Sequence, residues 1–381
     1  MQIGNFTIDD KSPVFIIAEL SANHNGSLDN ALETIKAAKR AGADCIKLQT
    51  YTADTITLDS DKEDFVIKGT IWDGKKLHTL YQEAYTPWEW HEQLYRVAKE
   101  EGLICFSSPF DKTAVDLLES LQSPAYKIAS FEITDIPLIE YVASKGKPVI
   151  ISTGIAEQED IELALEACHR MGNYDIALLK CTSSYPAPIE EANMCMVKDL
   201  AERYNVISGL SDHTMGSTVP IVATVFGAKI IEKHFIIDRA IGGPDASFSM
   251  NEEEFTAMVK AVREAEKASG VVDYTLTEKQ AKGKDFSTVI GPWLVTPDEL
   301  SPYLVPAKKG HVGNNYNLSM KCWVNDQLVS EGNVADMDWT FAEIIERCSY
   351  GVTVYPGDVI GSGTVGTGCF LELNGRSEER R

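Results

Sequence analysis

The feature that most constrains the fold is a regular alternation of short apolar runs with amphipathic helical stretches, which starts near residue 14. The helical stretches, such as SLDNALETIKAAKRAG and DIELALEACHRMG, repeat apolar residues at intervals of three and four. The runs between them are VFIIAEL (14–20), DCIKLQT (44–50), LICFSSP (103–109), AYKIAS (125–130), KPVIIST (147–153), IALLKCT (176–182), NVISGLSDH (205–213) and AKIIEKHF (228–235). Eight strand–helix units predict an α/β fold, a closed (β/α)8 TIM barrel over residues 1–268, rather than an open sheet.

After about residue 270 this repeat stops and the character of the chain changes. Residues 269–284 are polar and are expected to form a linker. Residues 285–381 alternate apolar and polar positions between glycines and prolines, as in YPGDVIGSGTVGTGCFLELNG, and include one helical stretch, WTFAEIIERCSY. The sequence therefore predicts a small, mostly β appendage after the barrel.

Polar residues occupy the carboxyl end of every apolar run, and this is the end at which (β/α)8 enzymes carry their active sites. Several come in pairs two residues apart, such as Lys47 with Gln49 and Glu232 with His234, so both members face the same side of their strand. A long insertion at 52–87 follows the second run and is expected at the same end. One polar strand end is ordinary, but eight that converge predict a functional site.

The residue types at these ends indicate the chemistry. Lysines and hydroxyls suit phosphate and carboxylate oxygens, although each serine alone is also explained as a hydrogen-bonded hydroxyl at a strand end. His213 and His234 end the seventh and eighth runs, close enough to share one divalent ion. One hydrogen-bonded histidine beside one catalytic base explains the spacing equally well. His24, after the first run, either contacts a ligand or caps a turn.

Charge and cysteine content exclude several classes of protein. The formal net charge of −22 argues against binding to nucleic acid or to an anionic membrane surface. The eight cysteines are scattered and form no CxxC pair, which is typical of a reducing cytosol. The start, MQIGNFTIDD, has no signal-peptide pattern, and no apolar run approaches the ~18 residues of a membrane span. A cytoplasmic protein is expected.

Nine ordered segments between residue 1 and about residue 265 carry a family resemblance. They are FIIAELSANHNGSL, AGADCIKLQTY, FSSPF, AYKIASFE, ISTG, KCTSSYP, GLSDHT, IEKHF and GGPDASFSM. Together they resemble the sialic acid synthase family. The opening MQIGNF, the AELSANH form and residues 59–91 resemble the branch of that family that makes pseudaminic acid. The N-acetylneuraminate and legionaminate branches are the alternatives.

The resemblance implies a metal-dependent condensation of phosphoenolpyruvate with an N-acetylated amino-sugar aldehyde, here a 2,4-diacetamido-2,4,6-trideoxy-altrose, to a nonulosonic 2-keto acid and phosphate. It also implies a homodimer. The residues it assigns are Glu19 as the acid/base; Lys47, Ser108, Lys127, Ser130, Ser152 and Ser211 for phosphoenolpyruvate; Gln49, Glu132, Tyr185 and Asp245 for the sugar; and His213 and His234 for a Mn²⁺, Mg²⁺ or Co²⁺ ion.

The appendage carries a different resemblance. KGKDFSTVIGPWLVTPDEL, NLSMKCWVNDQLVSEGN and GVTVYPGDVIGSGTVGTGCFLEL resemble the C-terminal half of a fumarylacetoacetate hydrolase domain, with Lys284 and Thr364 at substrate-side positions. Hydrolases of that family bind metal through carboxylates of the other half. Sialic acid synthases normally end instead in an antifreeze-like domain, which donates an arginine to the partner subunit's sugar site. Three functions follow: a sugar synthase with a passive appendage, a C–C hydrolase, or a non-catalytic sugar-binding protein. The polar strand ends favour the first.

Overall fold

The computed structural model describes residues 1–275 and 291–363. The chain divides into two compact units, a barrel unit at Met1–Asp273 and an appendage at Tyr274–Arg381. Part of the expected linker at 269–284 lies outside the described residues. Within the described ranges, no helix is long and apolar enough to cross a membrane.

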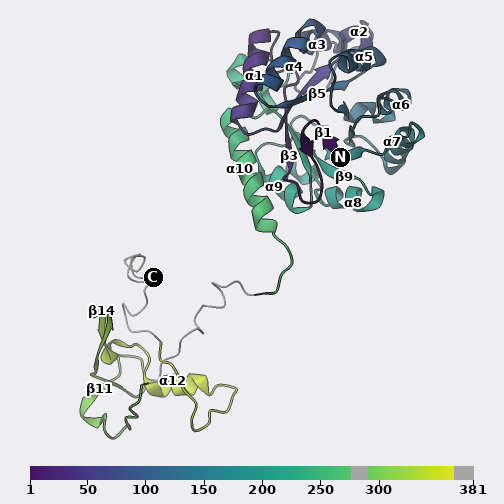
Figure 1. Cartoon of the computed structure of the whole chain (residues 1–381). Coiled ribbons are helices and arrows are strands. Elements are labelled where there is room, and N and C mark those ends of the chain that lie inside the picture. The colour runs from purple at the N-terminus through teal and green to yellow at the C-terminus, as the bar shows by residue number, and fades with distance from the viewer. Residues whose placement is uncertain (276–290, 364–381) are drawn as a thin grey trace. The chain divides into compact units, whose positions relative to one another are not determined.

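The barrel unit is a closed ring of eight parallel strands, which confirms the predicted TIM barrel (Figure 1). In ring order the strands are β10 (Ile230–His234), β3 (Phe15–Glu19), β4 (Cys45–Thr50), β5 (Ile104–Pro109), β6 (Tyr126–Ile128), β7 (Val149–Ser152), β8 (Ile176–Cys181) and β9 (Ile207–Asp212). The helices between and after them are α1 (Leu28–Arg40), α4 (His91–Glu100), α5 (Lys112–Ser120), α6 (Ile136–Ala143), α7 (Gln158–Arg170), α8 (Cys195–Tyr204), α9 (Thr218–Val225) and α10 (Glu252–Ser269). Each strand lies within one of the eight predicted runs.

The barrel interior changes from apolar to polar along the strands. In β3, Phe15 and Ile17 belong to the buried interior cluster, and Glu19 follows them on the same face. In β10, Ile230 belongs to that cluster and is followed on the same face by Glu232. Because strand residues alternate between faces, two apolar positions at the start of a strand place a polar side chain inside the barrel at its end.

The amino-terminal residues fill the opposite end of the barrel, a feature that the sequence analysis did not predict. β1 (Gln2–Ile3) and β2 (Phe6–Thr7) form a short antiparallel hairpin. Ile3 and Ile8 are fully buried in the same interior cluster as Phe15 and Ile17. This apolar layer supports the barrel from the side remote from the polar strand ends.

The insertion after β4 is ordered by short elements of its own. α2 (Ala53–Ile56) and α3 (Leu77–Ala84) flank a hairpin-like segment whose arms meet at an isolated antiparallel bridge between Val66 and Lys76. Trp72, between those arms, reaches the aromatic ring of Tyr185 from the loop after β8. The insertion therefore lies at the polar end of the barrel, as expected from its position in the sequence.

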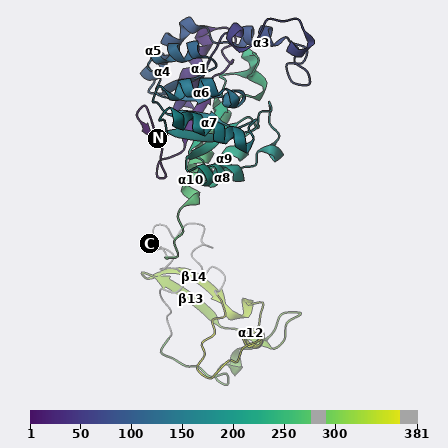
Figure 2. The ribbon, with the colours of Figure 1, turned by 90° about the vertical axis from the view of Figure 1, so that its right-hand side faces the viewer.

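The appendage is small and mostly β, as predicted. Its described residues form two antiparallel pairs and one helix: β11 (Leu304–Pro306) with β12 (Asn314–Tyr316), β13 (Ser319–Val324) with β14 (Gln327–Asn333), and α12 (Phe341–Cys348). The β13–β14 hairpin is clear in Figure 2. Large apolar side chains of this unit are poorly covered, since Trp293 and Trp323 are 88% and 56% exposed.

Candidate active site

The ends of β3, β4 and β10 bring one lysine and two carboxyl groups into a buried cluster. Lys47 Nζ lies 2.5 Å from Glu19 Oε2 and 3.6 Å from Glu232 Oε1. It also donates a hydrogen bond to Ser108 Oγ at 3.2 Å, and Gln49 Nε2 donates to Glu19 Oε1 at 3.1 Å. Glu19, Lys47 and Ser108, which were predicted from three separate motifs, therefore meet around one ammonium group.

Burial sets the protonation of this cluster. It raises the pKa of Glu19 to about 7, helped by the charge of Glu232 and opposed by Lys47. Burial also acts against the charged forms of the other two groups, but the opposite charges outweigh it. The pKa of Lys47 lies above its ordinary value, and the pKa of Glu232 lies below its own because of Lys47 and Lys127. Glu19 can therefore exchange a proton near neutral pH beside a permanent ammonium group.

A second lysine lies inside the barrel across from Glu232. Lys127 is 2% exposed, and its Nζ donates a hydrogen bond to the carbonyl oxygen of Ile128 at 3.0 Å. Burial lowers the pKa of Lys127, while Glu232 acts in the opposite sense. Ser211 Oγ, from β9, donates to Glu232 Oε1 at 3.1 Å. Glu232 thus lies 3.6 Å from Lys47 and acts electrostatically on Lys127, although it was not among the predicted site residues. The available signal was its place two residues before His234.

Hydroxyls that follow β6 and β8 surround Gly154, a glycine after β7 that has no room for a side chain. Ser130 Oγ accepts a hydrogen bond from the backbone N–H of Gly154 at 3.1 Å. A Cβ atom at Gly154 would lie 2.7 Å from that Oγ and 2.2 Å from Ser183 Oγ. Ser152 Oγ is buried and has no hydrogen-bond partner among the described residues. This part of the site offers hydroxyl donors to an anionic ligand.

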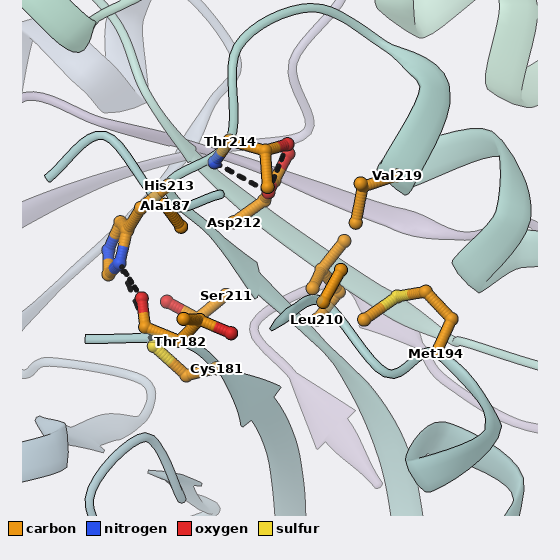
Figure 3. A pocket seen from close by; sticks show the side chains of 11 residues that line it. Cys181, Thr182, Ala187, Met194, Leu210, Ser211, Asp212, His213, Thr214 and Val219 are labelled. Atoms are coloured by element: carbon orange, nitrogen blue, oxygen red, sulfur yellow. Dashed lines mark hydrogen bonds between the residues drawn. The ribbon is translucent and has the colours of Figure 1, made fainter. Parts of the chain in front are cut away.

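His213 and His234 meet at the mouth of the barrel, with 5.4 Å between their ring centroids. Nδ1 of His213 donates to the Thr182 carbonyl oxygen at 2.9 Å, as Figure 3 shows, so its Nε2 is the nitrogen left for a ligand. Nδ1 of His234 is buried without a hydrogen-bond partner in the described part of the chain. It lies 3.9 Å from Asp245 Oδ2, which is beyond hydrogen-bond distance.

This pair fits a divalent ion that is shared with substrate. Burial and the nearby cations hold the pKa of His234 well below its ordinary value, which keeps it in the neutral form that binds metal. At His213 burial is outweighed by Cys181 and the Thr182 carbonyl, so its pKa is raised, and ion binding there would release a proton. Within residues 1–275 and 291–363, no group of three or more His, Cys, Asp or Glu side chains is placed to hold a metal. Two imidazoles would therefore leave the other coordination positions to substrate and water.

The predicted sugar residues surround the histidines in part. The ring of Tyr185 lies 4.3 Å from that of His213. Asp245 Oδ2 accepts hydrogen bonds from Ser21 Oγ at 2.5 Å and from a backbone N–H at 3.3 Å. Glu132 lies farther round the barrel in a 3-10 turn, where burial raises its pKa to about 7. His24 was expected either to contact a ligand or to cap a turn. Its Nδ1 accepts a hydrogen bond from the Gly26 N–H at 3.0 Å, so it caps a turn.

Not every polar residue at a strand end faces the site. Asp212 and Lys233 alternate with the inward residues of β9 and β10, pair in register, and form a buried salt bridge with each other. Asp212 Oδ1 also accepts hydrogen bonds from the N–H and Oγ1 of Thr214, at 2.9 and 2.8 Å (Figure 3). Lys233 donates to the Thr214 carbonyl at 2.6 Å. This pair fixes the turn that carries His213.

Replacing Lys233 with methionine should cost about 3–5 kcal/mol of unfolding free energy, because Asp212 would be left buried and unpaired. Urea unfolding followed by circular dichroism measures the loss. Lys36→Met, at an exposed position of α1, is the matched control and should change the unfolding free energy by less than about 0.5 kcal/mol. Equal stability of the two variants would contradict the role given to the buried pair.

Comparison with known proteins places the barrel unit in a family. Residues 34–274 match the NeuB family. The chain belongs to the NeuB family. Its relatives include the pseudaminic acid synthase of Campylobacter jejuni, which is 52% identical over 287 residues, covering 75% of this chain and 83% of that protein. The pseudaminic acid synthase of Helicobacter pylori is 48% identical over 274 residues, covering 72% and 81%.

The structures of NeuB-type enzymes agree with the fold described above. The N-acetylneuraminic acid (sialic acid) synthetase of Leptospira borgpetersenii, solved with citrate, superposes with a TM-score of 0.67 at 30% identity, covering 74% of this chain and 94% of that one. The appendage matches a different family, because residues 264–380 match the fumarylacetoacetate hydrolase C-terminal family. Both resemblances seen in the sequence are confirmed.

Proposed function

We propose that this NeuB-family chain is a pseudaminic acid synthase. It would condense phosphoenolpyruvate with the open-chain aldehyde of 2,4-diacetamido-2,4,6-trideoxy-altrose, giving a nonulosonic 2-keto acid and phosphate. The observation that carries the proposal is the convergence of Lys47, Lys127 and the site hydroxyls with the pair His213 and His234 at one end of a closed barrel. About half of the aligned residues are identical to those of synthases named for this product.

The lysines and hydroxyls would hold phosphoenolpyruvate. The groups assigned to it come from the ends of five strands, β4, β5, β6, β7 and β9, or from the turn after β6; they are Lys47, Ser108, Lys127, Ser130, Ser152 and Ser211. Ammonium and hydroxyl donors give short, charge-assisted hydrogen bonds to phosphate and carboxylate oxygens. Holding the enol in place beside the aldehyde lowers the entropic cost of bringing two substrates together.

The reaction divides into two bond-forming events. C3 of phosphoenolpyruvate adds to the aldehyde carbon, whose oxygen takes up a proton, and positive character develops at C2. Water then attacks C2 and loses a proton. The tetrahedral intermediate breaks its C2–O bond to phosphate, and loss of the remaining hydroxyl proton leaves the ketone. Glu19 is suited to give its proton to the aldehyde oxygen and then to accept one from the attacking water, because its pKa of about 7 lets it change protonation at neutral pH.

The divalent ion would be held by His213 and His234, and it would supply Lewis-acid polarisation of the aldehyde oxygen. Mn²⁺, Mg²⁺ and Co²⁺ all suit this role. Gln49, Glu132, Tyr185 and Asp245 are proposed to contact the sugar. Among these, Tyr185 and Asp245 are the ones that lie beside the two histidines.

A single assay tests the proposed function. Phosphate release from phosphoenolpyruvate is measured with the 6-deoxy diacetamido altrose, the corresponding legionaminic acid precursor and N-acetylmannosamine. We expect the first sugar to give the highest kcat/KM. Faster release with N-acetylmannosamine would place the chain in the N-acetylneuraminate branch. No release with any sugar would favour a sugar-binding protein over an enzyme.

The appendage has no assigned role in this reaction. The two residues that its hydrolase resemblance singles out, Lys284 and Thr364, lie outside the described residues. The domain limits at 268 and 284, the homodimer and the cytoplasmic location stay predictions.

A further inference from the structure

A chain of aromatic rings leads outward from the two histidines. Phe248 packs on His234 with 5.0 Å between ring centroids, and Tyr185 packs on His213. Tyr185 and Phe248 are themselves 5.2 Å apart. Trp72 forms the next layer, at 5.8 Å from Tyr185 and 6.4 Å from Phe248. These three residues, Trp72, Tyr185 and Phe248, are called the aromatic wall below.

Trp72 is held in place rather than attached loosely. Its Nε1 donates a hydrogen bond to the Pro244 carbonyl oxygen at 3.0 Å, which ties the insertion to the loop after β10. The hairpin arms around it are joined by backbone hydrogen bonds from the Ile67 N–H to the Lys75 carbonyl and from the Gly74 N–H to the Ile67 carbonyl, both 2.9 Å. A fixed indole of this kind presents a defined apolar surface to a ligand.

Trp72 also lines an open groove of about 860 Å³ beside the wall. Besides Trp72, its lining includes the polar residues Asn25, Lys75, Glu83 and Ser247 and the apolar residues Ile71 and Pro244. The groove is large enough for a sugar and its substituents. Its polar members suit hydroxyl and acetamido groups, whereas Ile71, Pro244 and the indole provide an apolar side.

We propose that Trp72 is a specificity-determining residue that receives the C6 methyl end of the sugar, an inference that rests on the proposed function. The aldehyde carbon, C1, belongs at the histidines, so the carbons remote from it extend along the aromatic wall toward Trp72. A 6-deoxy sugar ends in a methyl group. An apolar indole face can cover this methyl group without breaking any hydrogen bond to water. A 6-hydroxyl held against the same indole face would lose water there without gaining a hydrogen-bond partner from the ring.

The sugar pair that isolates this contact differs only at C6. It consists of 2,4-diacetamido-2,4,6-trideoxy-altrose and its 6-hydroxy counterpart. For the unmodified enzyme we expect kcat/KM to favour the 6-deoxy sugar by about 10–100-fold, the range that one apolar contact can provide. Trp72→Ala should bring this ratio to within about threefold of unity, mainly by lowering kcat/KM for the 6-deoxy sugar, while KM for phosphoenolpyruvate stays unchanged.

Two further variants separate the ring from its surroundings. Trp72→Phe keeps an apolar ring but loses the hydrogen bond to Pro244, and it should retain most of the selectivity. Leu58→Ala removes an apolar residue of the same insertion that is 69% exposed and does not line the groove, and it should leave the ratio unchanged. Thermal unfolding midpoints within a few degrees of the unmodified protein exclude a general loss of structure.

The outcomes distinguish this inference from the proposed function. If the unmodified enzyme turns over the 6-deoxy sugar but Trp72→Ala lowers kcat/KM equally for both sugars, the inference is overturned and the proposed function stands. If the unmodified enzyme gives no phosphate with either altrose derivative, both are overturned. A ratio that collapses in Trp72→Ala and is restored in Trp72→Phe supports the assignment.

Discussion

Replacing either His213 or His234 with alanine is expected to lower the rate of phosphate release by about a thousandfold or more, since a metal Lewis acid contributes several kcal/mol to a barrier of this type. The two rings are the imidazoles that meet at the mouth of the barrel, and each keeps one nitrogen without a protein partner in the described residues. Loss of one ring leaves too few ligands to retain the ion. Removal of the ion with a chelator should have the same effect, and excess Mn²⁺ should reverse it.

The control for the histidine variants is His169→Ala, which removes an exposed imidazole on α7 that stacks on Tyr174. Its turnover should match that of the unmodified enzyme. Calorimetric titration with Mn²⁺ provides a readout besides activity, and binding should be lost in His213→Ala and His234→Ala alone. Full turnover of either variant in the presence of chelator would remove the metal site from the proposal.

Replacing Lys47 with methionine should weaken phosphoenolpyruvate binding by about 10–150-fold, the equivalent of one charge-assisted hydrogen bond. Sugar binding should change by less than threefold, because the ammonium group faces Glu19, Glu232 and Ser108 rather than the aromatic wall. Isothermal titration with each ligand separately measures both effects. Equal losses for the two ligands would show that the anion site has been assigned wrongly.

The matched control for Lys47 is Lys180→Met. Lys180 is also a lysine at the end of a barrel strand, but it follows the interior residue Leu179 and so points to the outer face, where its Nζ donates to the Cys181 carbonyl at 2.6 Å. Phosphoenolpyruvate affinity should not change in this variant. A difference between Lys47→Met and Lys180→Met would show that affinity depends on the lysine inside the barrel and not on any positive charge at a strand end.

The same titrations carry a pH signature of Glu19. Its folded-state pKa of about 7 means that the carboxyl is neutral below that pH and negative above it. An anion in contact with Lys47 binds better when Glu19 is neutral, so affinity should fall as pH rises through 7 and binding should take up a proton. Glu19→Gln should remove the part of the pH dependence that exceeds the titration of the ligand itself.

Much of the barrel could be predicted because it rests on local patterns. Eight short apolar runs separated by amphipathic helices leave few arrangements other than a closed parallel sheet, and each observed strand lies within its predicted run. Alternation along a strand placed Lys47 with Gln49, and Glu232 with His234, on common faces. The amino-terminal hairpin was missed because its strands are only two residues long and show no periodicity.

The tertiary structure decided how these groups act on one another. Alternation alone does not show that Lys233 and Asp212 pair on the outer face while Lys47 bridges Glu19 and Glu232 inside. These contacts join different strands, β9 with β10, β3 with β4, and β4 with β10 across β3, so they depend on how the strands are placed in the closed barrel. The raised pKa of Glu19 likewise arises from burial, which no local motif records.

The position of Trp72 depends on the folded insertion in the same way. The sequence by itself determined the strands, the faces of their residues and the family. The contacts that give those residues their charge states and partners depend on distances across the closed barrel and between its loops, and these exist only once the chain has folded.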